Sequence, residues 1–266
     1  MGGGKERGIS LALGGGGARG FAHVGVIKVF SEAGIGIEEI TGSSMGAIVG
    51  AYYAFHQDIG GLEAFSRSLD RTRMLSYIDP LMPRYALMKG EKLKRLLTEW
   101  FGDARIEEAR IPLAIIATTL HDGKEAVLRE GRVVDALMAS AAIPGILPAV
   151  LIGGIYYVDG GVNHDLPLAG YRLRSTVRVA VSLTAEGDGR PLTHQPSIAD
   201  IFISLYQTHA GHTRQETKRL MRGGLVLSLT APINEALSFH KSAEYLRAGE
   251  TAAQEALPQL KRLLER

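Results

Sequence analysis

The sequence lacks cysteine entirely: none of its 266 residues carries a thiol. Disulfide bonds, thiol nucleophiles and cysteine metal sites are therefore excluded. Long hydrophobic runs are also missing, since no window reaches the roughly 18 apolar residues that a transmembrane helix needs. The apolar stretch after the charged N-terminus, Ile9–Leu13, runs directly into glycines and is too short for a signal peptide. We therefore expect a cytoplasmic protein that is either free in solution or peripheral at a membrane surface.

An excess of charge of one sign is missing as well. The formal net charge is only +2, and lysine and arginine are spread along the chain without a dense basic block. The sequence therefore gives no sign of a nucleic-acid partner. With 45% hydrophobic and 22% charged residues, the chain has the composition of an ordinary globular protein. We expect a single domain over residues 8–266, preceded by a flexible tail of residues 1–7.

Short apolar runs alternate with longer segments of helical period, which favours an α/β protein with a mainly parallel sheet. Gly34 stands just after the first helical segment, where glycines commonly end helices in a left-handed conformation. Buried strands are expected at residues 9–13, 35–41, 111–120, 177–183 and 225–229, and a hairpin at 149–158. Helices are expected at residues 21–33, 45–55, 133–142, 198–222 and 243–264, and across most of 60–105.

An amphipathic stripe lies within the predicted helical region 60–105. Its apolar members recur at helical spacing among lysines and glutamates: Leu93, Leu96, Leu97 and Trp100. Such a stripe usually packs into the core of a protein. A second hypothesis makes it a lid or a lipid-facing wall, together with three nearby apolar residues: Met82, Leu87 and Met88.

The segment GSSMG at residues 42–46 matches the G-x-S-x-G pattern of a nucleophile elbow. In such an elbow the serine occupies a sharp turn between a strand and a helix, and the flanking positions have no room for side chains. Here an apolar strand precedes the motif, and a helix rich in alanine and glycine follows it. The context favours Ser44 as a nucleophile, but a turn of small residues with Ser43 or Ser44 as a helix cap explains the motif about as well.

A second glycine-rich motif, GGGGARG at residues 14–20, follows the first predicted strand. Consecutive glycines allow several backbone N–H groups to converge on one anionic oxygen, which acyl transfer needs for its tetrahedral intermediate. Three of these glycines also fit the G-x-G-x-x-G turn that binds dinucleotides. That alternative requires an acidic residue about 20 positions later, where Glu38 and Glu39 stand. The glycine motif alone therefore leaves an oxidoreductase open.

The segment DGG at residues 159–161 follows an apolar strand-like run. A carboxylate at the end of a strand can take a proton from a serine, although an Asp-Gly turn is common and by itself shows nothing more. Five of the eight histidines follow Asp159, so the Ser-acid-His order of α/β-hydrolases is available, but none stands in a recognisable catalytic loop. His209 and His212 stand three residues apart, and no third ligand supports a metal site.

Taken together, these motifs resemble the patatin-like phospholipase family over almost the whole chain. Four blocks occur in the family's order. GGGARG at 15–20 resembles the glycine-rich oxyanion loop, and GSSMG at 42–46 resembles the nucleophile elbow. ASAAIP at 139–144 resembles a block that precedes the catalytic aspartate in bacterial members. YVDGGVNHDLP at 157–167 resembles the block that contains this aspartate, with NHD where many members have two asparagines.

The resemblance implies a three-layer α/β/α patatin-like fold, with the elbow and the aspartate loop opening on the same face of the sheet. It implies a hydrolase that cleaves acyl esters of phospholipids, lysophospholipids or related lipids with a Ser–Asp dyad, without histidine, metal or cofactor. Carried over by position, the dyad is Ser44 and Asp159. The supporting residues are Gly15, Gly16, Gly17, Arg19 and Gly20 in the oxyanion loop, Gly42, Met45 and Gly46 in the elbow, and Gly160 and Gly161 in the aspartate loop.

Arg19 has two expected roles in this scheme: it either fixes the glycine loop or meets an anionic head group. Two rivals to the hydrolase also stay open. One is a non-enzymatic adaptor on the same fold that binds a partner protein, and the other is the dinucleotide-binding oxidoreductase. The oxidoreductase leaves Ser44 without a role, and the adaptor leaves both Ser44 and Asp159 without one.

Overall fold

The computed structural model describes residues 8–68, 79–80, 86–164, 166–172, 177–183, 221, 223–229 and 238–265. Several sequence-based expectations fall on residues outside these ranges, including residues 69–78 and 81–85 of the expected helical region 60–105. Others are the flexible tail at 1–7, nearly all of the helix at 198–222, and the contribution of Met82 to a lid.

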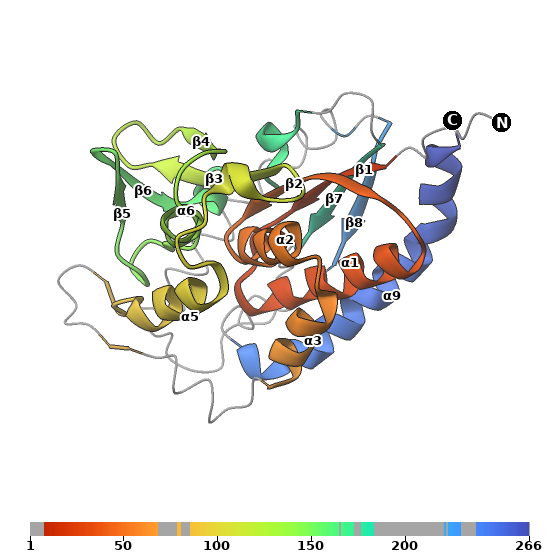
Figure 1. Cartoon of the computed structure of the whole chain (residues 1–266), viewed down its shortest axis with the longest axis horizontal. Helices are drawn as coiled ribbons and strands as arrows, with labels where there is room; N and C mark the ends of the chain where they lie inside the picture. Colours follow the sequence, from red (N-terminus) through yellow and green to blue (C-terminus); the bar gives the residue numbers. More distant parts are fainter. Residues whose placement is uncertain are drawn as a thin grey trace, which may run out of the picture.

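A mixed sheet forms the centre of the molecule (Figure 1). Hydrogen-bonded pairing connects its described strands along the path β5-β6-β3-β2-β1-β7-β8, and β4 pairs with β3 outside this path. The strands from β3 to β8 in this order pair in parallel, whereas β4, β5 and β6 pair antiparallel. The expected mainly parallel sheet is confirmed. The strand bounds are β1 Ile9–Leu13, β2 Ile37–Ser43, β3 Leu113–Thr119, β4 Glu125–Leu128, β5 Val150–Ile152, β6 Ile155–Asp159, β7 Val177–Ser182 and β8 Leu225–Ser228.

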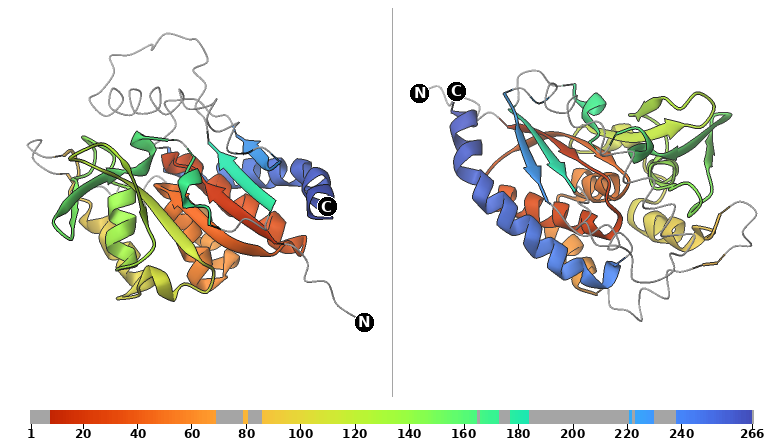
Figure 2. Two further views of the ribbon diagram at one scale, coloured as in Figure 1. Left: turned by 90° about the horizontal axis from the view of Figure 1, so that it is seen from above. Right: turned by 180° about the vertical axis from the view of Figure 1, so that it is seen from behind.

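The main helices lie on one face of the sheet (Figures 1 and 2). Along β2, Ile40 and Gly42 contact helix α2, whereas Thr41 between them points to the other face. On that other face the short 3-10 helix η4, Leu168–Gly170, packs against Thr41. Helical segments thus cover both faces, and the expected three-layer α/β/α architecture is confirmed. The helix bounds are α1 Ala22–Glu32, α2 Met45–His56, α3 Ile59–Ser68, α5 Glu91–Phe101, α6 Val133–Ser140 and α9 Ser242–Leu264.

Helices α1 and α9 pack closely against each other because each has a glycine at the crossing. A Cβ atom on Gly25 would overlap the carbonyl oxygen of Leu246, and a Cβ atom on Gly249 would overlap that of Ala22. The two backbones therefore approach more closely than larger side chains would permit. This contact attaches the long C-terminal helix to the first helix of the chain, next to the glycine loop.

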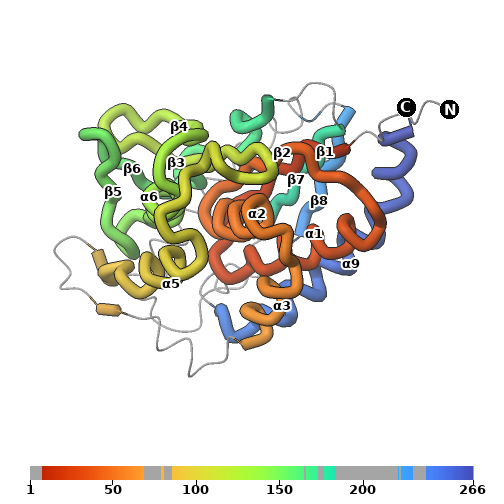
Figure 3. Tube along the Cα trace, in the orientation of Figure 1, coloured from red at the N-terminus to blue at the C-terminus, as the bar shows by residue number. Residues whose placement is uncertain are grey.

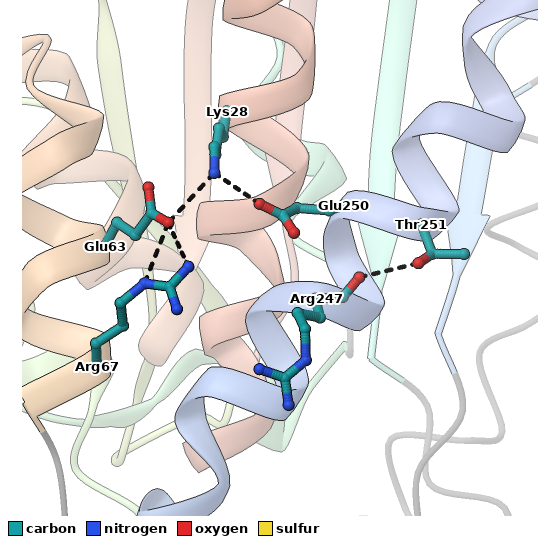
Figure 4. A network of polar contacts seen from close by, with 6 residues as sticks. All are labelled: Lys28, Glu63, Arg67, Arg247, Glu250 and Thr251. Atoms are coloured by element: carbon teal, nitrogen blue, oxygen red, sulfur yellow. Dashed lines mark hydrogen bonds and ion pairs between the residues drawn. The ribbon is translucent and has the colours of Figure 1, made fainter.

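An ion-pair network connects three of these helices at the protein surface (Figure 4). Lys28 on α1 donates to Glu250 on α9 at 2.8 Å and to Glu63 on α3 at 3.2 Å. Arg67 donates to the same Glu63 oxygen at 2.7 Å. The hydrogen bonds to Glu250 and then Glu63 raise the pKa of Lys28 above its ordinary value. The network is half-buried and holds α3 and α9 on either side of α1.

The apolar stripe on α5 belongs to the core. Leu97 is fully buried. The ring of Trp100 packs edge-on against Tyr52 and Phe65, with ring centroids 5.0 Å apart in both pairs. Leu93 also packs against the main apolar cluster. The core interpretation is therefore favoured for these three residues, with Leu97 inside the core and Leu93 and Trp100 partly buried against it.

Candidate active site

Ser44 lies at the junction between β2 and α2. Strand β2 ends at Ser43, and α2 begins at Met45. Ser44 has φ 53° and ψ −127°, a conformation that side chains other than glycine rarely adopt. Such strain persists only where the surrounding structure imposes it, and a sharp strand-to-helix turn at a serine is the geometry of a nucleophile elbow.

The glycines around Ser44 are sites of close backbone packing. A Cβ atom on Gly42 would lie 2.5 Å from the Cα of Ala47 in the first turn of α2. A Cβ atom on Gly46 would overlap the carbonyl oxygen of Leu13 and lie 2.5 Å from that of Gly14. The elbow therefore lies directly against the start of the glycine-rich loop. The absence of side chains at both positions is a steric requirement of this contact.

Hydrogen bonds fix the glycine-rich loop at Gly14 and at Gly16. The N–H of Gly14 donates to the Val181 carbonyl at 3.0 Å, and its own carbonyl lies 2.8 Å from His23 Nε2. Arg19 Nε donates to the Gly16 carbonyl at 3.1 Å, and the Arg19 residue is only 4% exposed. Of the two roles expected for Arg19, the structure thus contains the first, which is fixing the loop.

His23 is fully buried below this loop. Burial lowers its pKa from 6.5 to about 4, so the imidazole is neutral near pH 7. A neutral imidazole has one N–H, and the carbonyl of Gly14 can only accept, so the proton is assigned to Nε2. His23 therefore contacts the loop backbone as a hydrogen-bond donor.

Asp159 ends β6 and is fully buried. Its Oδ1 accepts a hydrogen bond from the N–H of Gly161 at 2.8 Å, which turns the chain directly after the strand. Its backbone carbonyl accepts from Thr118 Oγ1 at 3.0 Å. Asn163 Nδ2 donates to the same Thr118 hydroxyl at 3.2 Å and to the Gly123 carbonyl at 2.8 Å. The DGGVN segment is thus attached to β3 and the turn that follows it.

Strand pairing brings Ser44 and Asp159 together. Ala117 on β3 pairs with β4 on one edge and with Asp159 of β6 on the other. One position earlier, Ile116 pairs with β4 and, on the opposite edge, with Ser43 of β2. Strands β2 and β6 therefore share one edge of β3, and their carboxyl ends meet there. A Cβ atom on Gly160 would lie 2.7 Å from Ser43 Oγ, so the aspartate loop lies directly against the elbow.

Ser140, at the end of α6, connects these parts. Its Oγ accepts a hydrogen bond from the Ser44 N–H at 2.8 Å and donates to the Ile116 carbonyl at 2.6 Å. Two residues later, the Ala142 carbonyl accepts from the Asp159 N–H at 3.0 Å. The segment 139–144 thus holds the backbones of Ser44 and Asp159. Sequence reasoning noted this block but did not assign Ser140 a role, because its contact with Ser44 spans 96 residues.

The structure places Glu38 and Glu39 away from the position that a dinucleotide site requires for its acidic residue. Glu39 pairs with Ser10 near the start of β1, whereas the glycine loop follows the end of that strand. The Glu38 carboxylate accepts from the Gly8 N–H at 3.3 Å, and that of Glu39 accepts from the Arg172 N–H at 3.1 Å. Ribose recognition requires an acid near the carboxyl ends of the strands, and these two lie near the amino ends.

The remaining histidines give little support for a triad. His164 and His240 are the described histidines after Asp159, and neither has an ion pair or hydrogen bond among the described residues. His194, His209 and His212 lie outside the described residues. Among the residues that the structure describes, no group of three or more metal-ligating side chains occurs. Within the same ranges, no helix is long and apolar enough to span a bilayer.

The fold has counterparts among solved structures. VipD from Legionella pneumophila superposes with a TM-score of 0.53 and 12% identity, over 98% of this chain and 67% of VipD. ExoU of Pseudomonas aeruginosa, in its complex with SpcU, superposes with a TM-score of 0.50 and 16% identity, over 98% of this chain and 52% of that chain. At these identities the similarity shows a shared fold alone.

Sequence relatives are closer. An uncharacterised NTE family protein of Mycobacterium tuberculosis is 35% identical over 194 residues, which cover 71% of this chain and 53% of that protein. Lysophospholipase NTE1 of Saccharomyces cerevisiae is 32% identical over 201 residues, which cover 73% of this chain and 12% of that protein. The chain thus spans about half the length of the mycobacterial relative and far less of the yeast one. A family model described as patatin-like phospholipase matches residues 11–170. The chain belongs to the patatin-like phospholipase family.

Proposed function

We propose that this chain hydrolyses acyl esters of phospholipids or lysophospholipids, with Ser44 as nucleophile and Asp159 as its base. The observation that carries the proposal is the meeting of the β2 and β6 carboxyl ends on one edge of β3. A strained serine at a strand-to-helix turn then lies beside a buried carboxylate. A serine needs such an adjacent base to become an effective nucleophile.

In the acylation step, the Asp159 carboxylate accepts the proton of Ser44 Oγ while Oγ bonds to the ester carbonyl carbon. The tetrahedral intermediate collapses, the bond to the alcohol oxygen breaks, and the leaving alcohol takes the proton from Asp159. In the second step, water attacks the acyl-Ser44 ester and Asp159 accepts a water proton. The fatty acid leaves, and the proton returns to Ser44 Oγ.

The oxyanion of both tetrahedral intermediates needs hydrogen-bond donors, and the glycine loop can supply them. Among the described residues, the N–H groups of Gly15, Gly16 and Gly17 donate no hydrogen bond. The neighbouring carbonyls of Gly14 and Gly16 are held by His23 and Arg19. Fixing the carbonyls limits rotation of the loop peptides. This keeps the N–H groups available for a ligand oxygen.

The substrate class follows from family membership and from the relatives. One relative is named a lysophospholipase, and the family model is described as patatin-like phospholipase. An adaptor on the same fold is the second candidate, since ExoU forms a heterodimeric complex with SpcU. The strained conformation of Ser44 favours the hydrolase, because an adaptor has no use for backbone strain at a buried serine.

A substrate series tests this proposal. Purified protein is given p-nitrophenyl esters of increasing acyl length, then lysophosphatidylcholine and phosphatidylcholine in mixed micelles, with Ser44→Ala as control. We expect fatty-acid release from at least one glycerophospholipid, abolished in Ser44→Ala. Release that continues in the Ser44→Ala variant, or no release from any ester by the wild-type protein, would support the adaptor.

A further inference from the structure

A row of exposed apolar side chains crosses the end of the sheet nearest β5. Five large hydrophobic residues among the described ones are notably exposed, and four of them lie here: Leu120, Leu151, Ile155 and Tyr156. The fifth, Val226, lies on β8 at the opposite edge of the sheet. Figures 1 and 3 show β5 and β6 at the side of the molecule away from α9.

Three of these residues are direct neighbours across adjacent strands. Leu151 on β5 pairs with Tyr156 on β6. The N–H of Leu120, just after β3, donates to the Tyr156 carbonyl at 2.8 Å. Cross-strand neighbours project from the same face of a sheet. The side chains of Leu120, Leu151 and Tyr156 therefore form one apolar row, and each residue is more than half exposed.

Two residues of this row lie in a segment without charge, whereas Leu120 is followed by a charged turn at residues 121–125. From residue 136 to residue 158 there is no aspartate, glutamate, lysine, arginine or histidine. Edge strands of soluble proteins are usually protected by charged side chains, because an uncharged edge invites association. Here the edge strand β5 and its partner β6 are apolar on an exposed face. An exposed apolar face of this kind marks a binding surface.

A bilayer fits this row better than a second copy of the chain. Three side chains expose on the order of a few hundred Å² at most, whereas a stable dimer buries roughly 800 Å² on each partner. Insertion into a lipid surface has no such threshold, since each buried apolar side chain adds its own transfer free energy. Tyrosine is favoured at the boundary between hydrocarbon and water. Residues 136–158 also contain no carboxylate that an anionic lipid would repel, and the Asp122 carboxylate beyond Leu120 is ion-paired with Lys124 at 3.0 Å.

We infer that Leu120, Leu151 and Tyr156 form a lipid-docking row that seats the protein on a membrane surface. Tyr156 stands three residues before Asp159 on β6, so the row lies roughly 10 Å along the strand from the candidate base. The inference rests on the proposed function, since docking would bring the protein to the bilayer lipids that it is proposed to cleave.

Vesicle binding tests the inference without any need for catalysis. Leu151→Glu and Tyr156→Glu are compared with wild type by sedimentation with phosphatidylcholine vesicles, with and without added phosphatidylglycerol. The matched control is Val226→Glu, which places the same charge on an exposed apolar site at the other sheet edge. We expect each row variant to lower the partition coefficient roughly tenfold, since one buried apolar side chain supplies about that much. Val226→Glu should bind like wild type.

Two further measurements make the outcome decisive. The ratio of the rate on vesicle phospholipid to the rate on a soluble short-chain ester should fall roughly tenfold in the row variants. A Tyr156→Trp variant should show a blue shift of its fluorescence when vesicles are added. The inference would be overturned if both row variants bound vesicles as well as the wild-type protein does. It would also be overturned if light scattering showed a wild-type dimer that Leu151→Glu dissociates. No hydrolysis of any ester would refute the proposed function alone, because sedimentation still reports docking.

Discussion

Ser140 Oγ accepts a hydrogen bond from the backbone N–H of Ser44 at 2.8 Å, although 96 residues separate the two in the chain. The same hydroxyl donates to the Ile116 carbonyl on β3 at 2.6 Å. Ser140 therefore fixes the strained elbow to β3, the strand whose residue Ala117 pairs with Asp159 of β6. This buried hydroxyl thus connects the Ser44 backbone to the strand that pairs with Asp159.

The first prediction concerns this hydroxyl. Ser140→Ala leaves a buried N–H and a buried carbonyl without their partner, which costs about 1–3 kcal/mol. If this free-energy cost falls mainly on the positioning of Ser44 in the transition state, kcat should fall between roughly tenfold and a hundredfold. Steady-state kinetics on a soluble ester and thermal denaturation measure the two effects.

Ser43→Ala is the matched control for Ser140→Ala. Ser43 is also buried in the elbow, but its Oγ has no hydrogen-bond partner among the described residues. Its replacement should therefore leave kcat within a factor of about two, since no hydrogen bond is lost. Equal losses in Ser43→Ala and Ser140→Ala would show that Ser140 has no special role in positioning Ser44.

The second prediction concerns His23 and pH. Its pKa in the folded protein is lowered from 6.5 to about 4. Between these pH values the unfolded chain binds a proton that the folded chain does not, so stability falls as pH falls through this window. The total effect is about 3 kcal/mol at most. His23→Gln retains an N–H donor for the Gly14 carbonyl but cannot titrate, so its stability should depend less on pH between 6.5 and 4.

Activity separates a positioning role of His23 from a catalytic one. His23→Gln should keep most of kcat, whereas His23→Leu, which has no donor, should lower kcat roughly tenfold by releasing the glycine loop. If the glutamine variant is as inactive as Ser44→Ala while folded, His23 acts as a proton carrier, and the mechanism is not a Ser–Asp dyad.

The third prediction concerns Asp159. Asparagine is nearly isosteric and can still accept from the Gly161 N–H, so Asp159→Asn should fold normally. It should nevertheless lower kcat by about a thousandfold or more, the scale seen when a member of a catalytic unit is removed. Replacing each histidine after Asp159 by glutamine, one at a time, should have little effect on kcat. A histidine variant that is folded yet inactive would require a triad instead.

The fourth prediction concerns the packing of the elbow. Gly46→Ala places a Cβ atom into the carbonyl oxygens of Leu13 and Gly14, which are backbone atoms and cannot move aside cheaply. The variant should lose labelling of Ser44 and unfold at a lower temperature. Gly36→Ala is the control, since its Cβ would meet only one atom, at 4.0 Å. Equal melting temperatures for both variants would contradict the described contact.

Strands β1 and β3 could be read from sequence because they are buried and nearly continuous apolar runs. The hairpin at 149–158 and the glycine at position 34, with φ 73°, were also predicted correctly. Strand β4 was missed, since Glu125–Leu128 is short and follows a charged turn. Strand β2 begins at Ile37, not at residue 35, and continues to Ser43 because it pairs with β3 up to the elbow.

The arrangement of the site was harder to predict than its members. No local pattern shows that β2 and β6 share one edge of β3, since this depends on pairings that are distant in sequence. Ser140 is the clearest case. A serine near the end of a helix has many ordinary roles, and only the folded backbone brings it to Ser44.

Covalent labelling of Ser44 tests the central claim most directly. Wild-type protein is treated with a fluorophosphonate, and the modified peptide is identified by mass spectrometry, with Ser44→Ala and Asp159→Asn treated in parallel. The proposed mechanism predicts a single adduct on Ser44, absent in Ser44→Ala and formed much more slowly in Asp159→Asn. An adduct on Ser43, or an undiminished labelling rate in Asp159→Asn, would contradict it.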